Sequence, residues 1–201
     1  MIDFITESYG KEITIIYGEA GAGKTTLVKL AALAVAKEGN KVLFIDTEHG
    51  FHFERFQQLA GKDAEIALKN IFIIKPETFD YQTKKISELI AIAKSFSLII
   101  IDTIGLLYRK DYPEDRKKAN ATLEKQMRIL TEISRNVPVI LTNQVYADID
   151  ANALAMVGGD YIKQWCKKII FLQKQPRALI QQKPIKQKVP FTITSSGFSF
   201  P

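Results

Sequence analysis

A glycine-rich segment near the start of the chain has the residue types and spacing of a phosphate-binding loop. Residues 18–26 read GEAGAGKTT and match the pattern GxxxxGK[ST]. In such a loop the backbone N–H groups surround the phosphates of a nucleotide, the lysine contacts the β- and γ-phosphates, and the next hydroxyl ligates Mg²⁺. We therefore predict a nucleotide-phosphate site, with Thr25 as a metal ligand, over Gly18, Glu19, Ala20, Gly21, Ala22, Gly23, Lys24, Thr25 and Thr26.

Polar side chains that could act on such a nucleotide follow three apolar runs. Asp102 ends the run SLIIID, where an aspartate can hold the water shell of Mg²⁺. Glu48 follows KVLFID, and a carboxylate at the end of a strand beside the loop's own strand would face the γ-phosphate and could deprotonate the attacking water. Gln144 follows PVILTN, where its amide could hydrogen-bond the γ-phosphate and report its loss to the next segment. Taken singly, each residue also fits an ordinary solvated strand end.

The elements that must position these residues alternate between strand and helix, as in a doubly wound sheet. The apolar run 13–17 precedes the loop, and apolar residues at helical spacing follow it. In chain order we predict a helix over 24–37, strand 41–46, helix 53–60, strand 70–74, helix 79–95 with Ile86, Leu89, Ile90 and Ala93 inward, strand 97–102, helix 119–135 and strand 138–142. Beyond residues 158–159 we predict short antiparallel strands near 168–173, 178–182 and 191–194.

Length and composition favour one globular α/β domain over residues 1–201, with a mostly parallel central sheet and helices on both faces. The chain has 201 residues, of which 46% are apolar and 25% charged. Its single cysteine, Cys166, can form neither an internal disulfide nor a zinc cluster, so we expect a small buried side chain and a reducing, cytoplasmic setting. We find no bilayer-spanning apolar stretch and no export signal in residues 1–10, so we expect no membrane association.

Positive charge is concentrated at the C-terminal end. The net charge is +6, yet the first 160 residues carry 20 basic and 22 acidic side chains. Such a basic segment on a mildly acidic body fits contact with a polyanion such as nucleic acid, and it equally fits a solvated, lysine-rich face on the last strands. The eight basic residues that follow Asp160 are Lys163, Lys167, Lys168, Lys174, Arg177, Lys183, Lys186 and Lys188.

Together these segments resemble the RecA family of recombinases over nearly the whole chain. GEAGAGKTT, FIDTEHGFHFER, LIIIDTIGLLYRKDY, VILTNQV and the pair Gly158–Gly159 before Trp165 occur in that family's order and approximate spacing. The resemblance implies a RecA-like P-loop ATPase core that binds ATP and Mg²⁺. Within the family, the chain is most similar to the RadB branch, archaeal paralogues of the main strand-exchange recombinase without an N-terminal DNA-binding domain. Such proteins are taken to be weakly ATP-hydrolysing, DNA-binding accessory factors of homologous recombination and DNA repair.

The resemblance also implies roles for individual residues. The family's catalytic glutamate falls on Glu48, its phosphate-sensing glutamine on Gln144 and its adenine-stacking arginine on Arg55, whose planar guanidinium can stack on a base. Its first DNA loop falls on residues 108–118, where basic groups interleaved with tyrosines could contact phosphates and stack on bases. The alternative for this segment is an exposed, mixed-charge loop. The implied DNA contacts are Tyr108, Arg109, Lys110, Arg116, Lys117 and Lys118.

Two departures from the family pattern limit what the resemblance implies. The second DNA loop, residues 145–157, contains Asp148 and Asp150 but no lysine or arginine, which argues against strand exchange. The segment before the first strand lacks the family's aromatic-x-x-alanine polymerisation element, because Phe4 is followed three places later by Glu7. This difference argues against filament formation and leaves self-association open.

We therefore expect an ATP-binding, weakly ATP-hydrolysing accessory protein that binds single-stranded or branched DNA. The main recombinase and a Holliday-junction resolvase are the candidate protein partners. An alternative within the same superfamily is an ATP-responsive regulatory or docking module with little or no turnover and no direct DNA role. A ring-forming or autophosphorylating ATPase is a third hypothesis. Its phosphorylation sites would be Ser195, Ser196 or Ser199 of the tail.

Overall fold

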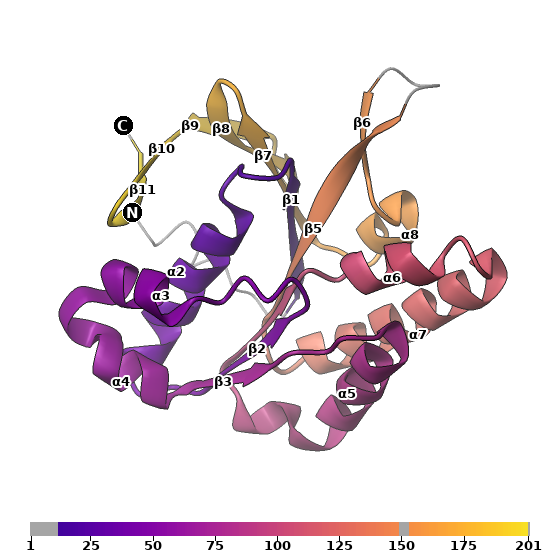
Figure 1. The fold of residues 1–201 in the computed structure, drawn as a ribbon, viewed down its shortest axis with the longest axis horizontal. Coiled ribbons are helices and arrows are strands. Elements are labelled where there is room, and N and C mark those ends of the chain that lie inside the picture. Colours follow the sequence, from indigo (N-terminus) through magenta and orange to yellow (C-terminus); the bar gives the residue numbers. More distant parts are fainter. Residues whose placement is uncertain (1–11, 149–152, 201) are drawn as a thin grey trace.

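The chain folds around one nine-stranded sheet, in a computed structural model that describes residues 12–148 and 153–200 (Figure 1). The strand order is β3-β2-β4-β5-β1-β7-β8-β9, with β6 paired to β5. All pairs from β3 to β7 are parallel, and β8, β9 and β6 run antiparallel to their partners. The strands are β1 Ile13–Gly18, β2 Val42–Asp46, β3 Ile71–Ile74, β4 Leu98–Asp102, β5 Val139–Asp148, β6 Ala153–Met156, β7 Lys168–Lys174, β8 Arg177–Lys183 and β9 Gln187–Pro190. A separate hairpin pairs β10 Thr192–Thr194 with β11 Gly197–Ser199.

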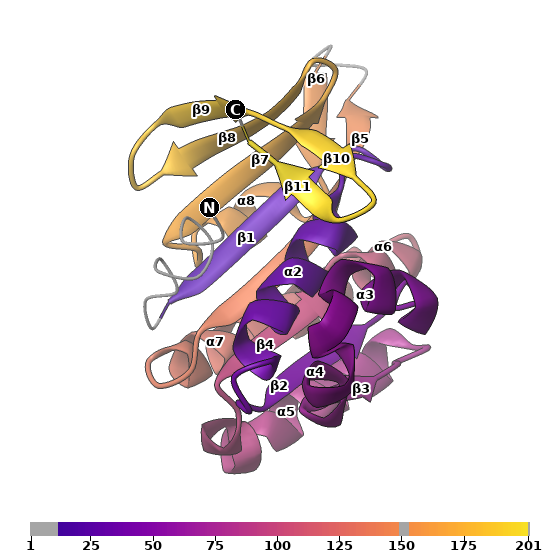
Figure 2. The same ribbon diagram turned by 90° about the vertical axis from the view of Figure 1, so that its left-hand side faces the viewer.

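Helices cover both faces of the sheet, as Figures 1 and 2 show. One layer contains α2 Lys24–Ala36, α3 Phe53–Ala60 and α4 Ala64–Lys69. The other contains α5 Phe79–Ile92, α6 Leu106–Asp111, α7 Arg116–Ser134 and α8 Gly159–Lys163. The β10–β11 hairpin lies beside α2, near the end of the helix that carries the glycine loop (Figure 2).

The central strands are apolar along their whole length because both of their faces are buried. In β4, Leu98 and Ile100 pack in the core on the α2 side, while Ile99 and Ile101 pack in the core on the α5–α7 side. All four side chains are fully buried. The continuous apolar runs that predicted these strands therefore reflect a sheet covered by two helical layers.

The predicted fold class is confirmed: the central sheet is mostly parallel, helices cover both faces, and short antiparallel strands follow at the C-terminal end. The strand order also places β5 between β1 and β4, so the strand of Asp102 does not touch the strand of the glycine loop. Among the described residues, none of the helices is long and apolar enough to cross a membrane.

Three details of the prediction were wrong. The strand near 168–173 is parallel to its neighbour β1 and antiparallel only to β8. The helix predicted from residue 119 begins at Arg116, because Asp115 caps it by accepting a hydrogen bond from the Lys118 N–H. Ile90 is 53% exposed, since α5 buries the narrower stripe that contains Ile86 and Leu89.

Candidate nucleotide-binding site

The glycine loop joins the end of β1 to the start of α2, and its glycines are required by its geometry. Gly21 and Gly23 have φ values of 76° and 106°, which lie in the left-handed region that side chains disfavour. A Cβ at Gly18 would collide with the carbonyl oxygen of Leu172 on β7. The backbone can therefore turn tightly enough to place Lys24 at the first position of the helix.

Lys24 is held inside this loop. Its ammonium group donates hydrogen bonds to the carbonyl oxygens of Gly18 and Glu19, each at 2.9 Å, and the residue is 7% exposed. Burial lowers the pKa of Lys24, while the nearby carboxylates of Glu48 and Asp102 favour its charged form. The cation therefore sits where the phosphates of a nucleotide would lie in a loop of this kind.

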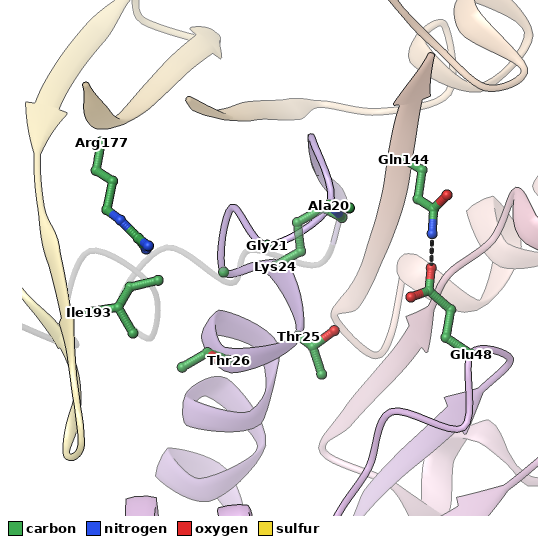
Figure 3. A pocket seen from close by; sticks show the side chains of 10 residues that line it. Ala20, Gly21, Lys24, Thr25, Thr26, Glu48, Gln144, Arg177 and Ile193 are labelled. Carbon is green, nitrogen blue, oxygen red and sulfur yellow. Dashed lines mark hydrogen bonds between the residues drawn. The ribbon is translucent and has the colours of Figure 1, made fainter. Parts of the chain in front are cut away.

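The loop forms one side of an open cleft of about 440 Å³ (Figure 3). Glu48 and Gln144 lie together on one side of the loop, and Gln144 Nε2 donates a hydrogen bond of 2.6 Å to Glu48 Oε1. The two residues are 96 positions apart in the chain, so the fold alone brings them together. The cleft is lined by Ala20, Gly21, Gly23, Lys24, Thr25, Thr26, Glu48, Gln144, Arg177 and Ile193.

Glu48 reaches the cleft by a different route from the one predicted. Its strand, β2, is separated from β1 by β4 and β5, so it is not beside the strand of the loop. The segment after β2 instead turns toward the end of β4, where the Thr47 N–H donates to Asp102 O at 2.9 Å. The Thr47 hydroxyl also bonds both the carbonyl and the N–H of Thr103, each at 2.8 Å. This attachment carries Glu48 across to the side chains that end β5.

Hydrogen bonds fix the rest of the Glu48 loop. Both carboxylate oxygens of Asp46 accept backbone N–H bonds, from Gly50 at 2.9 Å and from Phe51 at 3.0 Å. Lys29, on α2, donates to Gly50 O at 2.8 Å, and its ammonium lies 5.3 Å from the centre of the Phe51 ring. His49 adopts a positive φ of 54°, which completes the tight turn. The loop that carries Glu48 is therefore tied to the helix that begins at the phosphate-binding loop.

The surroundings of Asp102 fit a metal ion that arrives with a nucleotide. Asp102 is fully buried; its Oδ1 accepts a hydrogen bond from the Thr142 hydroxyl, and its Oδ2 has no hydrogen-bond partner among the described residues. Burial raises the pKa of this carboxyl group to about 6, although Thr142 and the neighbouring Thr25 hydroxyl favour its ionised form. The described residues contain no cluster of three His, Cys, Asp or Glu side chains that could hold a metal. A magnesium ion here would need phosphate oxygens as ligands, with Thr25 and Asp102 beside it.

Comparisons with known proteins show which family the chain belongs to. The family model described as Rad51 matches residues 6–193. The chain belongs to the Rad51 family. It is 37% identical to "DNA repair and recombination protein RadB" of Methanosphaera stadtmanae over 174 residues, covering 83% of this chain and 75% of that protein. The RadB proteins of Methanococcus maripaludis (strain C7) and Methanoculleus marisnigri are 40% and 32% identical; the matches cover 82% and 93% of this chain and 77% and 88% of those proteins.

A solved structure shows the same fold in a relative. The "Crystal structure of the RadB recombinase" matches with a TM-score of 0.78 and 31% identity, covering 94% of this chain and 90% of that chain. The resemblance to the RecA family, and within it to RadB, is therefore confirmed by sequence and by fold.

Arg55, predicted to stack on adenine, lies outside the lining of the cleft. It is on α3, and its guanidinium donates to the carbonyl oxygens of Ser195 at 2.9 Å and Thr194 at 3.1 Å, in the turn of the β10–β11 hairpin. Arg55 therefore anchors the hairpin whose Ile193 does line the cleft.

The predicted first DNA loop of this Rad51-family chain is mostly helical. Residues 108–111 lie in α6, and the segment from Arg116 onward is the start of α7. Tyr108 was wrongly assigned to base stacking: its ring is 5% exposed, and its hydroxyl donates to Asn120 Oδ1 at 2.7 Å. Burial raises the pKa of Tyr108 to about 12. The predicted basic contacts Arg109, Lys110, Arg116, Lys117 and Lys118 are all exposed.

The structure also bears on the predictions made for Cys166 and for the C-terminal basic residues. Cys166 is buried, as expected. Lys168, counted with the C-terminal basic residues, is 5% exposed and so adds little to a surface charge. Asp150, Phe4 and Glu7 lie outside the described residues.

Three residues around the cleft were missed as site residues. Lys29 is a buried lysine between Val28 and Leu30, in an otherwise apolar part of α2. A lysine within this apolar run was the available signal that its charge has a specific partner. Arg177 was read only as part of the C-terminal charge, and Ile193 only as a strand residue. No local pattern signalled that these two segments return to the glycine loop.

Proposed function

We propose that this Rad51-family chain is an ATP-binding, weakly ATP-hydrolysing, DNA-binding accessory protein of homologous recombination and DNA repair. The observation that supports it most is the convergence of Lys24, Thr25, Glu48 and Gln144 on one cleft around the glycine loop. The RadB names of its relatives support the role in DNA repair and recombination. An archaeal, cytoplasmic setting belongs to the same proposal.

Each residue of the cleft has a task in this proposal. Lys24 exchanges its bonds to loop carbonyls for the β- and γ-phosphates, while Thr25 and Asp102 hold Mg²⁺ and its water shell. Glu48 orients and deprotonates the attacking water. Gln144 bonds the γ-phosphate through the amide that otherwise contacts Glu48.

Two further contacts belong to the proposal. Because the backbone carbonyl of Gln144 accepts the Val157 N–H at 3.1 Å, a shift of Gln144 can reach the β5–β6 segment. Arg55 stacks on adenine, as the family resemblance implies.

The variant Lys24→Ala tests the nucleotide site directly. We expect ATP affinity to fall by at least about a hundredfold, because two charge-assisted contacts to phosphate are lost. Isothermal titration with and without Mg²⁺ measures the loss, and circular dichroism checks that the variant is folded. Unchanged ATP affinity in the folded variant contradicts the proposal.

DNA is the second ligand in this proposal. The exposed basic residues on α6, at the start of α7 and on the C-terminal strands supply positive charge for single-stranded or branched DNA. The main recombinase and a Holliday-junction resolvase are the proposed protein partners. Measuring the ATPase rate and the mass in solution, each with and without single-stranded DNA, tests this part: stimulation with assembly supports an active recombinase, and neither supports an accessory role.

One contact favours a second function, an ATP-responsive docking module with little or no turnover and no direct role at DNA. Glu48 Oε1 accepts the Gln144 amide at 2.6 Å, so one oxygen of the proposed base is already engaged. In that case ATP binds, the hydrolysis rate equals that of Glu48→Gln, and DNA affinity is absent. Rates measured in parallel for the two proteins separate these functions.

A further inference from the structure

The cleft has a second side that none of the assigned residues occupies. Glu48 and Gln144 lie on one side of the glycine loop, whereas Arg177 and Ile193 lie on the other (Figure 3). In loops of this kind the lysine reaches the β- and γ-phosphates. With Glu48 and Gln144 beside the γ-phosphate, the rest of a bound nucleotide extends toward Arg177 and Ile193. This step rests on the proposed function.

The C-terminal sheet holds Arg177 firmly in this place. Arg177 begins β8, pairs with Lys174 across the tight turn between β7 and β8, and its carbonyl accepts the Phe191 N–H at 3.3 Å. Since β7 is parallel to β1, this turn lies at the same sheet edge as the glycine loop. A Cβ placed at Gly21 would lie 3.8 Å from Lys174 Nζ, so the turn directly borders the loop.

The guanidinium of Arg177 is free to bind a ligand. It is exposed, and within residues 12–148 and 153–200 it forms no hydrogen bond or ion pair. Figure 3 shows it extending from β8 toward the loop, next to Ile193. An arginine presents several N–H donors in a planar fork that matches phosphate and sugar oxygens. It is therefore an unpaired cation that lines the cleft on the side away from Glu48.

Ile193 gives this side an apolar surface. Its Cδ1 would lie 2.6 Å from a Cβ at Gly23, so it packs directly on the loop, and it is a partly buried side chain that packs against the core on the α2 side. Arg55 anchors the turn that follows it. An apolar side chain beside an unpaired guanidinium suits the part of a nucleotide where the ribose joins the α-phosphate. The apolar side chain can contact the sugar or the base, while the guanidinium binds the phosphate.

We propose that Arg177, supplied by the C-terminal sheet of the same chain, binds the α-phosphate and ribose of the nucleotide, with Ile193 packed beside them. Arg177 thereby makes nucleotide affinity depend on the β7–β8 turn. Its contribution is the same for ATP and ADP, because it lies on the side of the loop away from the γ-phosphate.

The test compares Arg177→Gln with Lys94→Gln, a variant that removes one exposed charge just before the amino end of β4, at the sheet edge opposite the glycine loop. Affinities for ATP and for ADP are measured by titration with Mg²⁺ at fixed ionic strength. We expect Arg177→Gln to weaken both nucleotides by about tenfold and by equal factors, the size of one charge-assisted contact. Lys94→Gln should leave both affinities unchanged.

Two results overturn the inference. Affinities of Arg177→Gln equal to those of Lys94→Gln remove Arg177 from the site, and a loss confined to ATP places its contact at the γ-phosphate instead. Both variants change exposed side chains, and circular dichroism confirms their folding. Failure of the wild-type chain to bind ATP, or binding that survives Lys24→Ala, overturns the proposed function instead, so the two failures are distinguishable.

Discussion

At the scale of single residues, the hydrogen bond between Glu48 and Gln144 links the proposed base to the proposed sensor. The amide of Gln144 cannot bond both Glu48 and a γ-phosphate through the same hydrogen. The amide carries a second hydrogen, so Glu48 Oε1 becomes free for water only where Gln144 turns away from it toward the phosphate. This exchange is a physical reason for a base that is idle until ATP is bound.

The variant Glu48→Gln tests the base without disturbing this contact. The new amide oxygen can still accept the Gln144 N–H, so ATP affinity should change by less than about twofold. Hydrolysis should fall by on the order of a hundredfold, since proton abstraction by a positioned carboxylate contributes at least that much. Single-turnover measurement of ADP formation records the effect. Equal rates for both proteins would support the docking module over the ATPase.

Asp102 gives a prediction about pH. Its pKa in the folded protein is about 6, above the ordinary value of 3.8, so the folded state binds its proton more tightly than the unfolded chain. The ionised group therefore destabilises the ligand-free fold as pH rises from about 4 to 6, and the full penalty, about 3 kcal/mol, is present above this range. We expect Asp102→Asn to unfold at a higher temperature than wild type at pH 7.5.

The control for this gain in unfolding temperature is the same comparison at low pH. At pH 4 the carboxyl group is protonated in the folded protein, so the variant and wild type should unfold at nearly equal temperatures. Calorimetry of both proteins at the two pH values gives the comparison. A gain of the same size at pH 4 would mean that charge on Asp102 is not its cause. The same variant should also lose the Mg²⁺ dependence of ATP binding.

At the scale of elements, the segments that the sequence predicted well are those with a physical reason to show a local pattern. Strands buried on both faces are continuous apolar runs, and the glycine loop needs small residues at positive φ. The α6 helix was missed because its residues, LLYRKD, are half charged and too few to show a helical stripe. The direction of β7 was missed because pairing with β1 is a property of the whole sheet.

The candidate site also contains residues with a local sequence pattern and residues without one. The glycine loop, Glu48, Asp102 and Gln144 could be predicted because each follows or belongs to a recognisable strand end. Lys29 and Arg177 could not, because their importance lies in contacts with segments far away in the chain. Glu48 lines the predicted cleft but not for the predicted reason, since its strand is not a neighbour of β1.

Lys29 gives a prediction about the coupling of two elements. It is 3% exposed, lies on α2, and holds the Glu48 loop through Gly50 O. We expect Lys29→Met to lower the hydrolysis rate by roughly ten- to a hundredfold, because a loosened loop misplaces the base. ATP affinity should be nearly unchanged, since Lys29 does not line the cleft.

The split between turnover and ATP affinity separates this positioning role from a merely structural one. Methionine has a similar length but leaves Gly50 O without its donor and removes a cation near Asp46 and Asp102, so we expect some loss of stability. The expected combination is a lower turnover rate and a somewhat lower unfolding temperature with unchanged ATP affinity. Lys37→Met, at the exposed end of α2, is the matched control and should change neither quantity. A fall in ATP affinity and stability together would argue against positioning.

At the scale of the whole molecule, the two basic regions differ in their balance of charge. The α6–α7 segment alternates its basic residues with Asp111, Glu114 and Asp115. The exposed lysines of β8 and β9 and the turn between them form no ion pair within the described part of the chain and have no acidic residue near them in sequence. We therefore expect this second region, Lys183, Lys186 and Lys188, to contribute more to DNA affinity.

A salt titration measures that contribution. For single-stranded DNA, the logarithm of affinity falls with the logarithm of salt concentration by about 0.7 per phosphate neutralised. Replacing all three lysines by glutamine should therefore reduce the slope by about 2, and replacing Arg109, Lys110 and Lys117 should reduce it by less. The control triple, Lys62, Lys84 and Lys94 to glutamine, removes equal charge from exposed positions elsewhere and should leave the slope unchanged. Anisotropy of a labelled oligonucleotide between 50 and 300 mM salt gives all four slopes, and equal slopes for the control and the strand triple would remove the C-terminal strands from the DNA contact.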